Sequence, residues 1–189
     1  MTIKDSFGSD YAAPIFFVSP NQINYLLPAG VAEGLSTVTI TNAAGTVTRG
    51  LLKVGRVAPG IFTADASGKG YAAADVQIRS DGSERYERVA RYDPTTNQFA
   101  ANPIRLLPNE SAFLILYGTG WRKRSDLAAV KARIGGLETE VLYAGPQGGY
   151  AGLDQLNLRL PPSLIGRGDI TVELEIDGQP TNPVKLSIQ

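Results

Sequence analysis

The sequence contains no cysteine and no histidine among its 189 residues. The chain therefore has no thiol nucleophile, no disulfide framework, no Ser-His-Asp triad and no zinc site of the usual kind. Its 18 basic and 18 acidic residues give a formal net charge of zero, so no overall field attracts nucleic acid or an anionic membrane. No apolar run reaches the ~18 residues of a membrane-spanning helix. We expect no cofactor, no nucleic-acid partner and no membrane insertion.

Short alternating patterns and turn residues dominate what is present. The 21 glycines and 12 prolines together make up about 17% of the chain, against ~12% in average usage. This excess indicates many turns. Apolar and polar residues alternate, as in a sheet with one buried face, over residues 37–41, 47–54, 156–160, 170–176 and 184–188. The apolar run 112–117 predicts a central strand, and 125–130 is the best helix candidate, with Ser125 as its N-cap. The sequence predicts an all-β fold with little helix.

One segment of the chain occurs twice. Residues 21–28 match residues 154–161, with Gln, Asn, Leu and Pro identical at an offset of 133. The same offset carries Gly45 onto Gly178. A match of this length and spacing is the signature of an internal repeat, so one sandwich motif is expected in two copies.

The strand that precedes the repeated segment also recurs. Residues 15–20 align with residues 141–146 at an offset of 126, so seven residues are inserted in the second copy, around 147–152. Further upstream, residues 2–5 parallel residues 130–133. The repeat therefore extends over several strands.

The two copies are unequal. The second has strands from about residue 106 onward, and counterparts of residues 106–120 would precede Met1 in the first copy. We therefore expect this chain to be the tail of a longer protein. A half-sandwich leaves apolar surface in water, at a free-energy cost of ~25 cal/mol per Å². It also leaves a strand edge unpaired. Its cover would come from residues 71–106, which form an expected β-meander, from the second sandwich, or from a neighbouring molecule.

Five motifs carry a resemblance to a known family. They are APIFFVSPNQIN at 13–24, VAPGIF at 57–62, LYGTG at 116–120, VLYAGP at 141–146 and GLDQLN at 152–157. With these motifs in order over essentially the whole chain, the sequence closely resembles the Solibacter-type uncharacterised C-terminal domain family of large exported bacterial proteins. The resemblance implies immunoglobulin-like modules of the IPT/TIG kind, an extracellular or cell-surface location, and a signal peptide far upstream. It implies no catalytic residue.

The expected architecture is two immunoglobulin-like β-sandwich modules joined by a β-meander. Residues 1–57 form the C-terminal part of a first sandwich that lacks its N-terminal strands. Residues 58–104 form a linker and the meander, and residues 105–189 form a second, complete sandwich. Upstream domains of the same polypeptide are the expected partners.

Four residues are candidate ligand contacts: Trp121, Arg122, Arg124 and Tyr150. The first three combine an aromatic ring with a basic cluster, which could bind an anionic polymer by stacking and charge. The alternative is that Trp121 caps the sandwich and the basic side chains are solvated. Tyr150 lies in a glycine-rich loop that either contacts a ligand or only connects two strands. No catalytic or metal-binding residue is expected.

The amide pairs of the repeat, Gln22 with Asn24 and Gln155 with Asn157, are expected to be structural, with their side chains bonded to neighbouring loop backbone. Three functions remain open. The leading hypothesis is a non-catalytic spacer, anchor or interaction surface at the end of an exported protein. The others are a carbohydrate- or polymer-binding module and self-assembly by strand addition into the open first copy.

Overall fold

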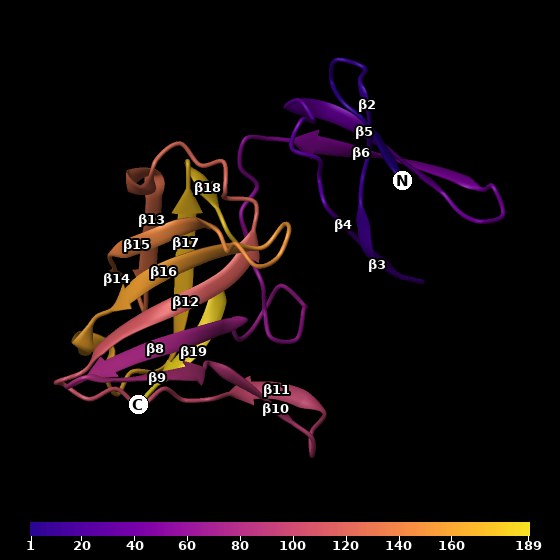
Figure 1. Ribbon diagram of the computed structural model, residues 1–189. Helices are drawn as coiled ribbons and strands as arrows, with labels where there is room; N and C mark the ends of the chain where they lie inside the picture. Colours follow the sequence, from indigo (N-terminus) through magenta and orange to yellow (C-terminus); the bar gives the residue numbers. More distant parts are fainter. The chain divides into compact units, whose positions relative to one another are not determined.

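The computed structural model describes all 189 residues, and the chain is all-β, as the sequence predicts (Figure 1). Its only helical elements are two single 3₁₀ turns, Leu127–Ala129 and Pro162–Leu164. None of its helical segments has the length and apolar character needed to span a bilayer. The chain divides into two compact units, Met1–Arg56 and Val57–Gln189.

The larger unit is a sandwich of two antiparallel sheets. One sheet has the order β15-β16-β12-β8-β9, with β7 also paired with β12. Its strands are β7 (Gly60–Ile61), β8 (Ala74–Ser80), β9 (Ser83–Arg88), β12 (Ser111–Thr119), β15 (Val141–Pro146) and β16 (Asp154–Leu160). The other sheet has the order β14-β13-β17-β18, with β19 also paired with β17. Its strands are β13 (Val130–Ile134), β14 (Leu137–Glu138), β17 (Gly168–Ile176), β18 (Gln179–Pro180) and β19 (Val184–Ile188).

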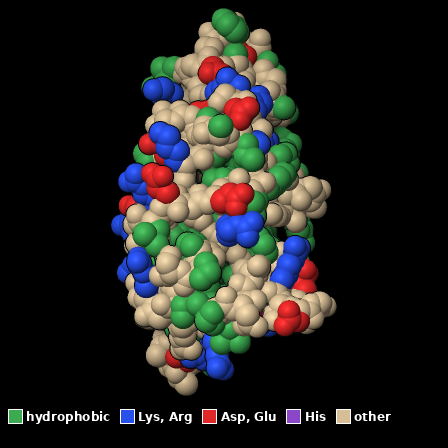
Figure 2. All heavy atoms as spheres, turned by 90° about the vertical axis from the view of Figure 1, so that its left-hand side faces the viewer, with side chains coloured by type: hydrophobic (Ala, Val, Ile, Leu, Met, Phe, Trp, Pro, Cys, Tyr) green, Lys and Arg blue, Asp and Glu red, His purple; other side chains and the backbone are tan.

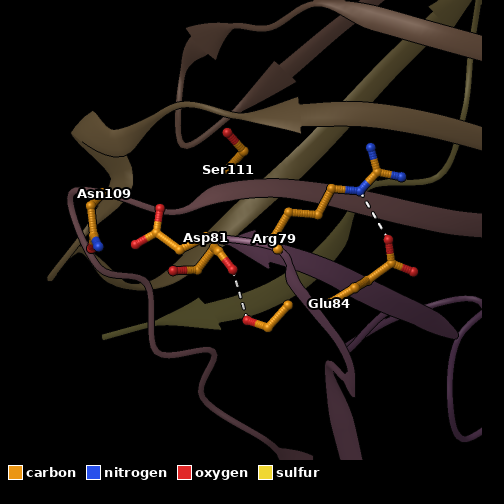
Figure 3. Close-up of a pocket in the computed structure, with 8 residues that line it drawn as sticks. Arg79, Asp81, Glu84, Asn109 and Ser111 are labelled. Carbon is orange, nitrogen blue, oxygen red and sulfur yellow. Dashed lines mark hydrogen bonds and ion pairs between the residues drawn. The ribbon is translucent and has the colours of Figure 1, made fainter.

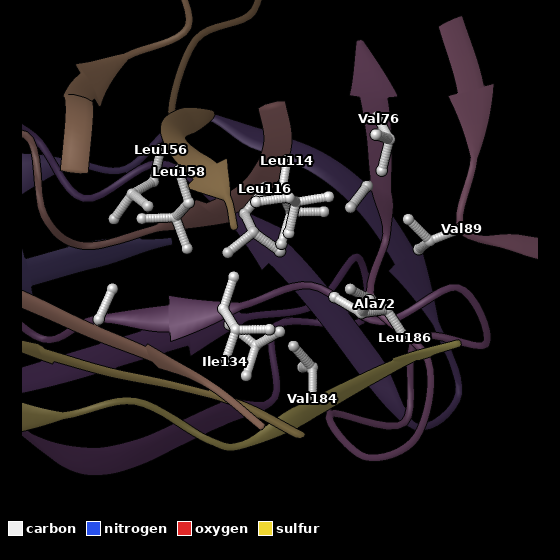
Figure 4. Packing of buried hydrophobic residues seen from close by; sticks show 14 of the residues in the cluster. Ala72, Val76, Val89, Leu114, Leu116, Ile134, Leu156, Leu158, Val184 and Leu186 are labelled. Carbon is white, nitrogen blue, oxygen red and sulfur yellow. The ribbon is translucent and has the colours of Figure 1, made fainter. Parts of the chain in front are cut away.

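The core of this unit lies between the two sheets. The predicted central strand is confirmed, because β12 lies between β16 and β8 in the middle of its sheet. Every second residue of β12 and β16 is buried, so each strand contributes one apolar face. Figure 4 shows their leucines on one side of the core, with Ile134, Val184 and Leu186 on the other. The core cluster contains 26 buried hydrophobic residues, enough to hold this sandwich together.

The segment expected as a linker and meander, residues 58–104, belongs to this sandwich. Strand β8 pairs with β12, and β9 pairs with β8 across a tight turn at Asp81 and Gly82. Strands β10 (Ala90–Asp93) and β11 (Gln98–Ala101) form a separate hairpin. The Ile104 N–H then donates to the Ser187 carbonyl at 2.8 Å. The meander strands form where predicted, but β8 and β9 are part of the β12 sheet, whereas β10 and β11 pair only with each other.

The best helix candidate, residues 125–130, is reduced to the 3₁₀ turn Leu127–Ala129. Asp126 and not Ser125 is its N-cap, because the Asp126 carboxylate accepts from the Ala128 N–H at 2.8 Å. The Ser125 hydroxyl instead donates to Oδ1 of Asp177 at 2.5 Å. Val130 then continues as the first residue of β13, which is consistent with the marginal stability of a helix of only one or two turns.

The smaller unit has a four-stranded sheet and a separate hairpin. The sheet order is β2-β1-β5-β6, with β1 (Thr2–Lys4), β2 (Asp10–Ala12), β5 (Gly34–Thr41) and β6 (Val47–Val54). The hairpin consists of β3 (Ile15–Ser19) and β4 (Gln22–Tyr25), and no other strand pairs with it. In Figure 1 the hairpin extends away from the sheet of its own unit.

The repeat predicted from the sequence is present in the strand pairing. In β3 and β4, Val18 pairs with Ile23, as Ala144 pairs with Leu156 in β15 and β16. The register shift that follows Ile15 also follows Val141. These pairs are related by the predicted offsets of 126 and 133, so the two hairpins share one register and one bulge. The order β2-β1-β5-β6 likewise corresponds to β14-β13-β17-β18.

The parallel drawn between residues 2–5 and 130–133 is wrong by one residue. It aligns Ile3 with Lys131, but Ile3 is fully buried and the Lys131 side chain is 75% exposed in an ion pair with Glu175. Because side chains alternate between the two faces of a strand, a shift of one residue exchanges the buried and exposed sets. The strands correspond, but not in that register.

The smaller unit has little core. Its buried hydrophobic residues are Ile3, Ala13, Val31 and Val54. Nine of the seventeen exposed large hydrophobic side chains of the protein lie in residues 1–56, namely Phe7, Ile15, Phe16, Phe17, Val18, Leu27, Leu35, Val47 and Leu51. A unit of this size with so few buried side chains is marginal in stability.

Candidate functional site

The end of the sandwich at which β12 terminates holds three of the four predicted contact residues. Strand β12 ends at Thr119, and Gly120 has a φ of +87°, a conformation that glycine adopts without strain. The chain therefore turns inward, and Trp121 is 0% exposed. Its indole N–H donates to the Gln155 carbonyl at 3.2 Å. This corrects the expectation of a ligand contact, because the ring offers no face for stacking.

Arg122 and Asp154 form a partly buried ion pair beside this ring. Nε of Arg122 lies 2.8 Å from Oδ1 of Asp154, whose side chain is 0% exposed. The backbone N–H groups of Trp121 and Arg122 both donate to Oδ2 of the same carboxylate, at 2.9 and 3.1 Å. A buried carboxylate is tolerated when it is paired and hydrogen-bonded in this way. Arg122 thus joins the turn after β12 to the first residue of β16.

Tyr150 lies in the loop between β15 and β16 and is 74% exposed. The loop is fixed at its far end, where Thr119 Oγ1 donates to the Gly152 carbonyl at 3.0 Å and Arg122 Nη2 to the Leu153 carbonyl at 3.0 Å. These bonds place the loop beside the Arg122 turn. Of the four predicted residues, Tyr150 has by far the most exposed side chain on a loop, as a ligand contact requires.

Arg124 is half-buried, and its Nε atom is buried without a hydrogen-bond partner. The backbone N–H of Arg124 closes the turn by donating to the Trp121 carbonyl at 3.1 Å. The backbone of Arg124 therefore belongs to the turn that follows Trp121.

Sequence reasoning missed the residue that organises this end, Asp154. A signal for it was present in the repeat, because the otherwise matched segments differ at their first position, Asn21 in one copy and Asp154 in the other. An acidic residue at the start of a buried strand needs a donor, and Arg122 supplies it. The repeated amides also differ from expectation: Gln22 donates to Asn24 and Gln155 to Asn157, side chain to side chain.

A shallow polar depression of about 460 Å³ lies at the β8–β9 turn (Figure 3). It is lined by Arg79, Ser80, Asp81, Gly82, Ser83, Glu84, Asn109 and Ser111. The Arg79 guanidinium, its only cationic group, lies 3.0 Å from the Glu84 carboxylate in an exposed ion pair. The only cation of the depression is therefore already paired, and Asp81 adds a second carboxylate to the lining.

The pKa lies below its ordinary value at the carboxyl groups of Asp5, Asp65, Glu84, Asp93 and Glu110. At Glu84 the cause is hydrogen bonding, first from Tyr86 and then from Gln77 and Arg79, which lowers the pKa. A general acid in glycoside hydrolysis needs a raised pKa. Glu84 therefore has the wrong shift for that role.

Charged side chains are paired over much of the surface. Figure 2 shows basic and acidic side chains beside one another on the face that it presents, with hydrophobic side chains between them. Exposed ion pairs of this kind join Lys131 to Glu175 and Arg159 to Glu140. On that face no broad area carries charge of a single sign.

No protein-family model, curated protein or solved structure matches the chain. A functional assignment therefore has to come from the geometry of the chain itself, above all from the repeat and from the difference between its two copies.

Proposed function

We propose that the chain is a non-catalytic structural and interaction module, built of immunoglobulin-like (IPT/TIG-like) sandwiches, at the C-terminal end of a larger exported or cell-surface bacterial protein. The observation that carries the proposal is the repeat. One hairpin with one register and one bulge occurs twice, flanked by further strands in residues 57–189 and open in residues 1–56. A duplicated scaffold is suited to spacing, anchoring and presenting surfaces.

The use of the polar side chains supports a structural role. At the sandwich end Asp154 holds the turn after β12, and Asp177 accepts from the N–H and hydroxyl of Ser125. The Asn182 amide donates to the carbonyls of Ile61 and Gly68 and accepts from the Ile61 N–H. These groups bind the protein's own loops. The family resemblance of the motifs supports the exported setting.

Detection of the natural protein tests whether the chain is part of a larger protein that is exported or held at the cell surface. An antibody raised against the chain is expected to recognise, in surface and culture-medium fractions of the source bacterium, a band far above the 20.1 kDa of this chain. External protease added to intact cells should remove that band. A band near 20 kDa that stays protected inside the cells would contradict the proposal.

Activity assays test the non-catalytic part. The purified chain is expected to give background rates on a panel of glycoside, ester and peptide substrates. Turnover that a single substitution such as Glu84→Gln abolishes would show an enzyme and overturn this part.

The exposed Tyr150 favours one second candidate, a carbohydrate- or polymer-binding module. A tyrosine that is 74% exposed on an anchored loop offers a ring on which a sugar can stack. Retardation in polysaccharide affinity gels that is lost in Tyr150→Ala would support this candidate. The matched control is Tyr86→Ala, which removes another exposed tyrosine from β9, at the opposite edge of the same sheet. Equal retardation of both variants and the parent would exclude it.

A further inference from the structure

The edge of β4 is open where its counterpart is paired. Strand β16 pairs with β15 on one side and with β12 on the other, over seven residue pairs from Ala112–Leu160 to Gly118–Asp154. Strand β4 pairs only with β3. Because the β3–β4 and β15–β16 registers are the same, the side of β4 that corresponds to the β12 side of β16 has no partner.

The lengths of the two strands agree with a missing neighbour. Strand β16 continues to Leu160, and in its last two residues the ladder partners are Phe113 and Ala112 of β12. Strand β4 ends at Tyr25, the counterpart of Leu158. The β3–β4 and β15–β16 pairings thus end at corresponding residues. Beyond that point β16 continues only where it pairs with β12.

The open edge carries a defined set of backbone donors. The Leu26 N–H donates to the Pro14 carbonyl at 2.9 Å, as the Arg159 N–H donates to the Glu140 carbonyl at 3.0 Å. Backbone N–H groups alternate in direction along a strand. Ile23, Tyr25 and Leu27 therefore direct their N–H groups away from β3, toward the open edge.

The side chains of the same three residues are incompletely covered. Their counterparts Leu156, Leu158 and Leu160 are 0%, 0% and 3% exposed. In the first copy, by contrast, Ile23 and Tyr25 are only half-buried and Leu27 is 38% exposed. Across the hairpin, Val18 is 63% exposed, whereas its counterpart Ala144 is fully buried.

Asn21, which directly precedes β4, indicates one more property of the missing strand. Asp154 accepts the two backbone N–H groups that follow β12 and pairs with Arg122. Its counterpart Asn21 has a neutral side chain whose carbonyl can accept such N–H groups but needs no cation. The strand that fits this edge therefore does not require an arginine in the turn after it.

We propose that the β4 edge binds one antiparallel strand of the β12 type, contributed by polypeptide that precedes residue 1 in the larger protein. This strand carries apolar side chains at alternate positions, extends the β4 ladder to Leu27, and is followed by a turn whose N–H groups donate to Asn21. The inference rests on the proposed function, because it requires a larger protein, and it names the partner that completes the first sandwich.

A peptide with the sequence of residues 109–121, extended by lysines for solubility, is the probe. Added to the full 189-residue chain, it is expected to bind and to slow amide exchange at Ile23, Tyr25 and Leu27, with little change at Gln22 and Asn24. The control peptide carries aspartate in place of Leu114 and Leu116, the apolar residues that are buried in β12. It is expected to bind at least ~10-fold more weakly, because charge replaces the side chains to be buried.

Two chain variants place the same charge on opposite faces of β4. The Ile23 side chain corresponds to that of Leu156, which is buried in the core of the sandwich. Ile23→Asp is therefore expected to weaken peptide binding by ~10-fold or more. Asn24→Asp lies on the other face, keeps an acceptor oxygen for Gln22, and is expected to leave binding unchanged. Equal effects of the two variants would overturn the proposal.

Other outcomes are equally decisive. Absence of binding, or protection at β9 and not at β4, overturns the inference. Concentration-dependent dimers of the chain alone, with the three β4 amides protected, would make a second copy the occupant and overturn the assignment to preceding polypeptide. Peptide binding together with a natural protein of only 20 kDa would overturn the proposed function and the assignment of the strand to preceding polypeptide, but it would confirm the open edge. Absence of peptide binding to the chain of a larger natural protein would overturn the inference and leave the proposed function in place, so the two failures are distinguishable.

Discussion

Asp154 is the residue on which the intact end of the sandwich depends. Its carboxylate is fully buried and meets one guanidinium and two backbone N–H groups. Asp154→Ala leaves these donors unpaired and is expected to lower the free energy of unfolding of residues 57–189 by about 3 kcal/mol. Denaturant unfolding followed by Trp121 fluorescence measures it. The matched control is Asn21→Ala at the corresponding exposed position of the other copy, where a change beyond about 0.5 kcal/mol would contradict this account.

Asp5 gives the smaller unit a defined pH dependence. Burial disfavours its charged form, but backbone N–H groups of Ser9, Ala32 and Phe7 outweigh burial and lower the pKa below the ordinary 3.8. A lowered pKa contributes stability that is complete above the unfolded value and is lost as the pH falls through the folded value.

The stability of residues 1–56 is therefore expected to be constant from pH 7 to about 5 and to fall below about 4. Asp5→Asn should flatten this dependence. Amide exchange of Ile3, measured between pH 3 and 7 and corrected for intrinsic rates, reports it. An unchanged profile in the variant would show that the carboxylate bonds are not the cause.

At the scale of single elements, the turn after β12 needs glycine for two separate reasons. Gly120 has a φ of +87°, and a Cβ there would lie 2.0 Å from the Ala58 carbonyl oxygen. Gly136 has a similar φ of +80° but open space around it. Gly136→Ala is expected to cost about 1 kcal/mol, the penalty of the left-handed conformation alone, and Gly120→Ala about 3 kcal/mol or more because backbone must also move. Equal thermal shifts in the two variants would remove the steric explanation.

The strands themselves were largely predictable. Alternation located β5, β6, β16, β17 and β19, and the two offsets in the sequence, 126 and 133, aligned the residues that pair in the two hairpins. Identity of side chains could do this because a register is set by which residues face the core. The bulge that both hairpins share was not predicted. The parallel between residues 2–5 and 130–133 had no such identities, and it was wrong by one residue.

The candidate site was less predictable. A tryptophan beside arginines has the same sequence signature whether its ring stacks on a ligand or fills a core. Trp121 is buried because Gly120 turns the chain inward and because Asp154, 33 residues further along the chain, binds the turn. The contact with Asp154 is not local in sequence. Tyr150 could be predicted because a glycine-rich loop offers few side chains among which to bury it.

At the scale of the whole molecule, the two units differ in how much core they have. The larger has 26 buried hydrophobic residues and the smaller has four. Domains below ~70–80 residues rarely reach more than ~3–5 kcal/mol even with a full core. Urea titration followed by amide exchange and by tryptophan fluorescence is expected to show residues 1–56 unfolding first. A single coincident transition for both units would contradict this.

The sheet that residues 58–104 join is likewise a property of the whole molecule. Its strands were located correctly, but sequence alone does not say which sheet a meander joins. Pairing of β8 with β12 depends on contacts between residues about 40 positions apart in sequence, such as Val76 with Leu114, and no repeat or motif encodes that pairing.

Residue-resolved amide exchange on the 189-residue chain by itself compares the two copies of the repeat directly. If one motif is complete in its second copy and open in its first, the N–H groups of Leu156, Leu158 and Leu160 exchange slowly, while those of Ile23, Tyr25 and Leu27 exchange at rates close to those of an unfolded chain. Comparable protection of the two sets would show that the first copy has no open edge.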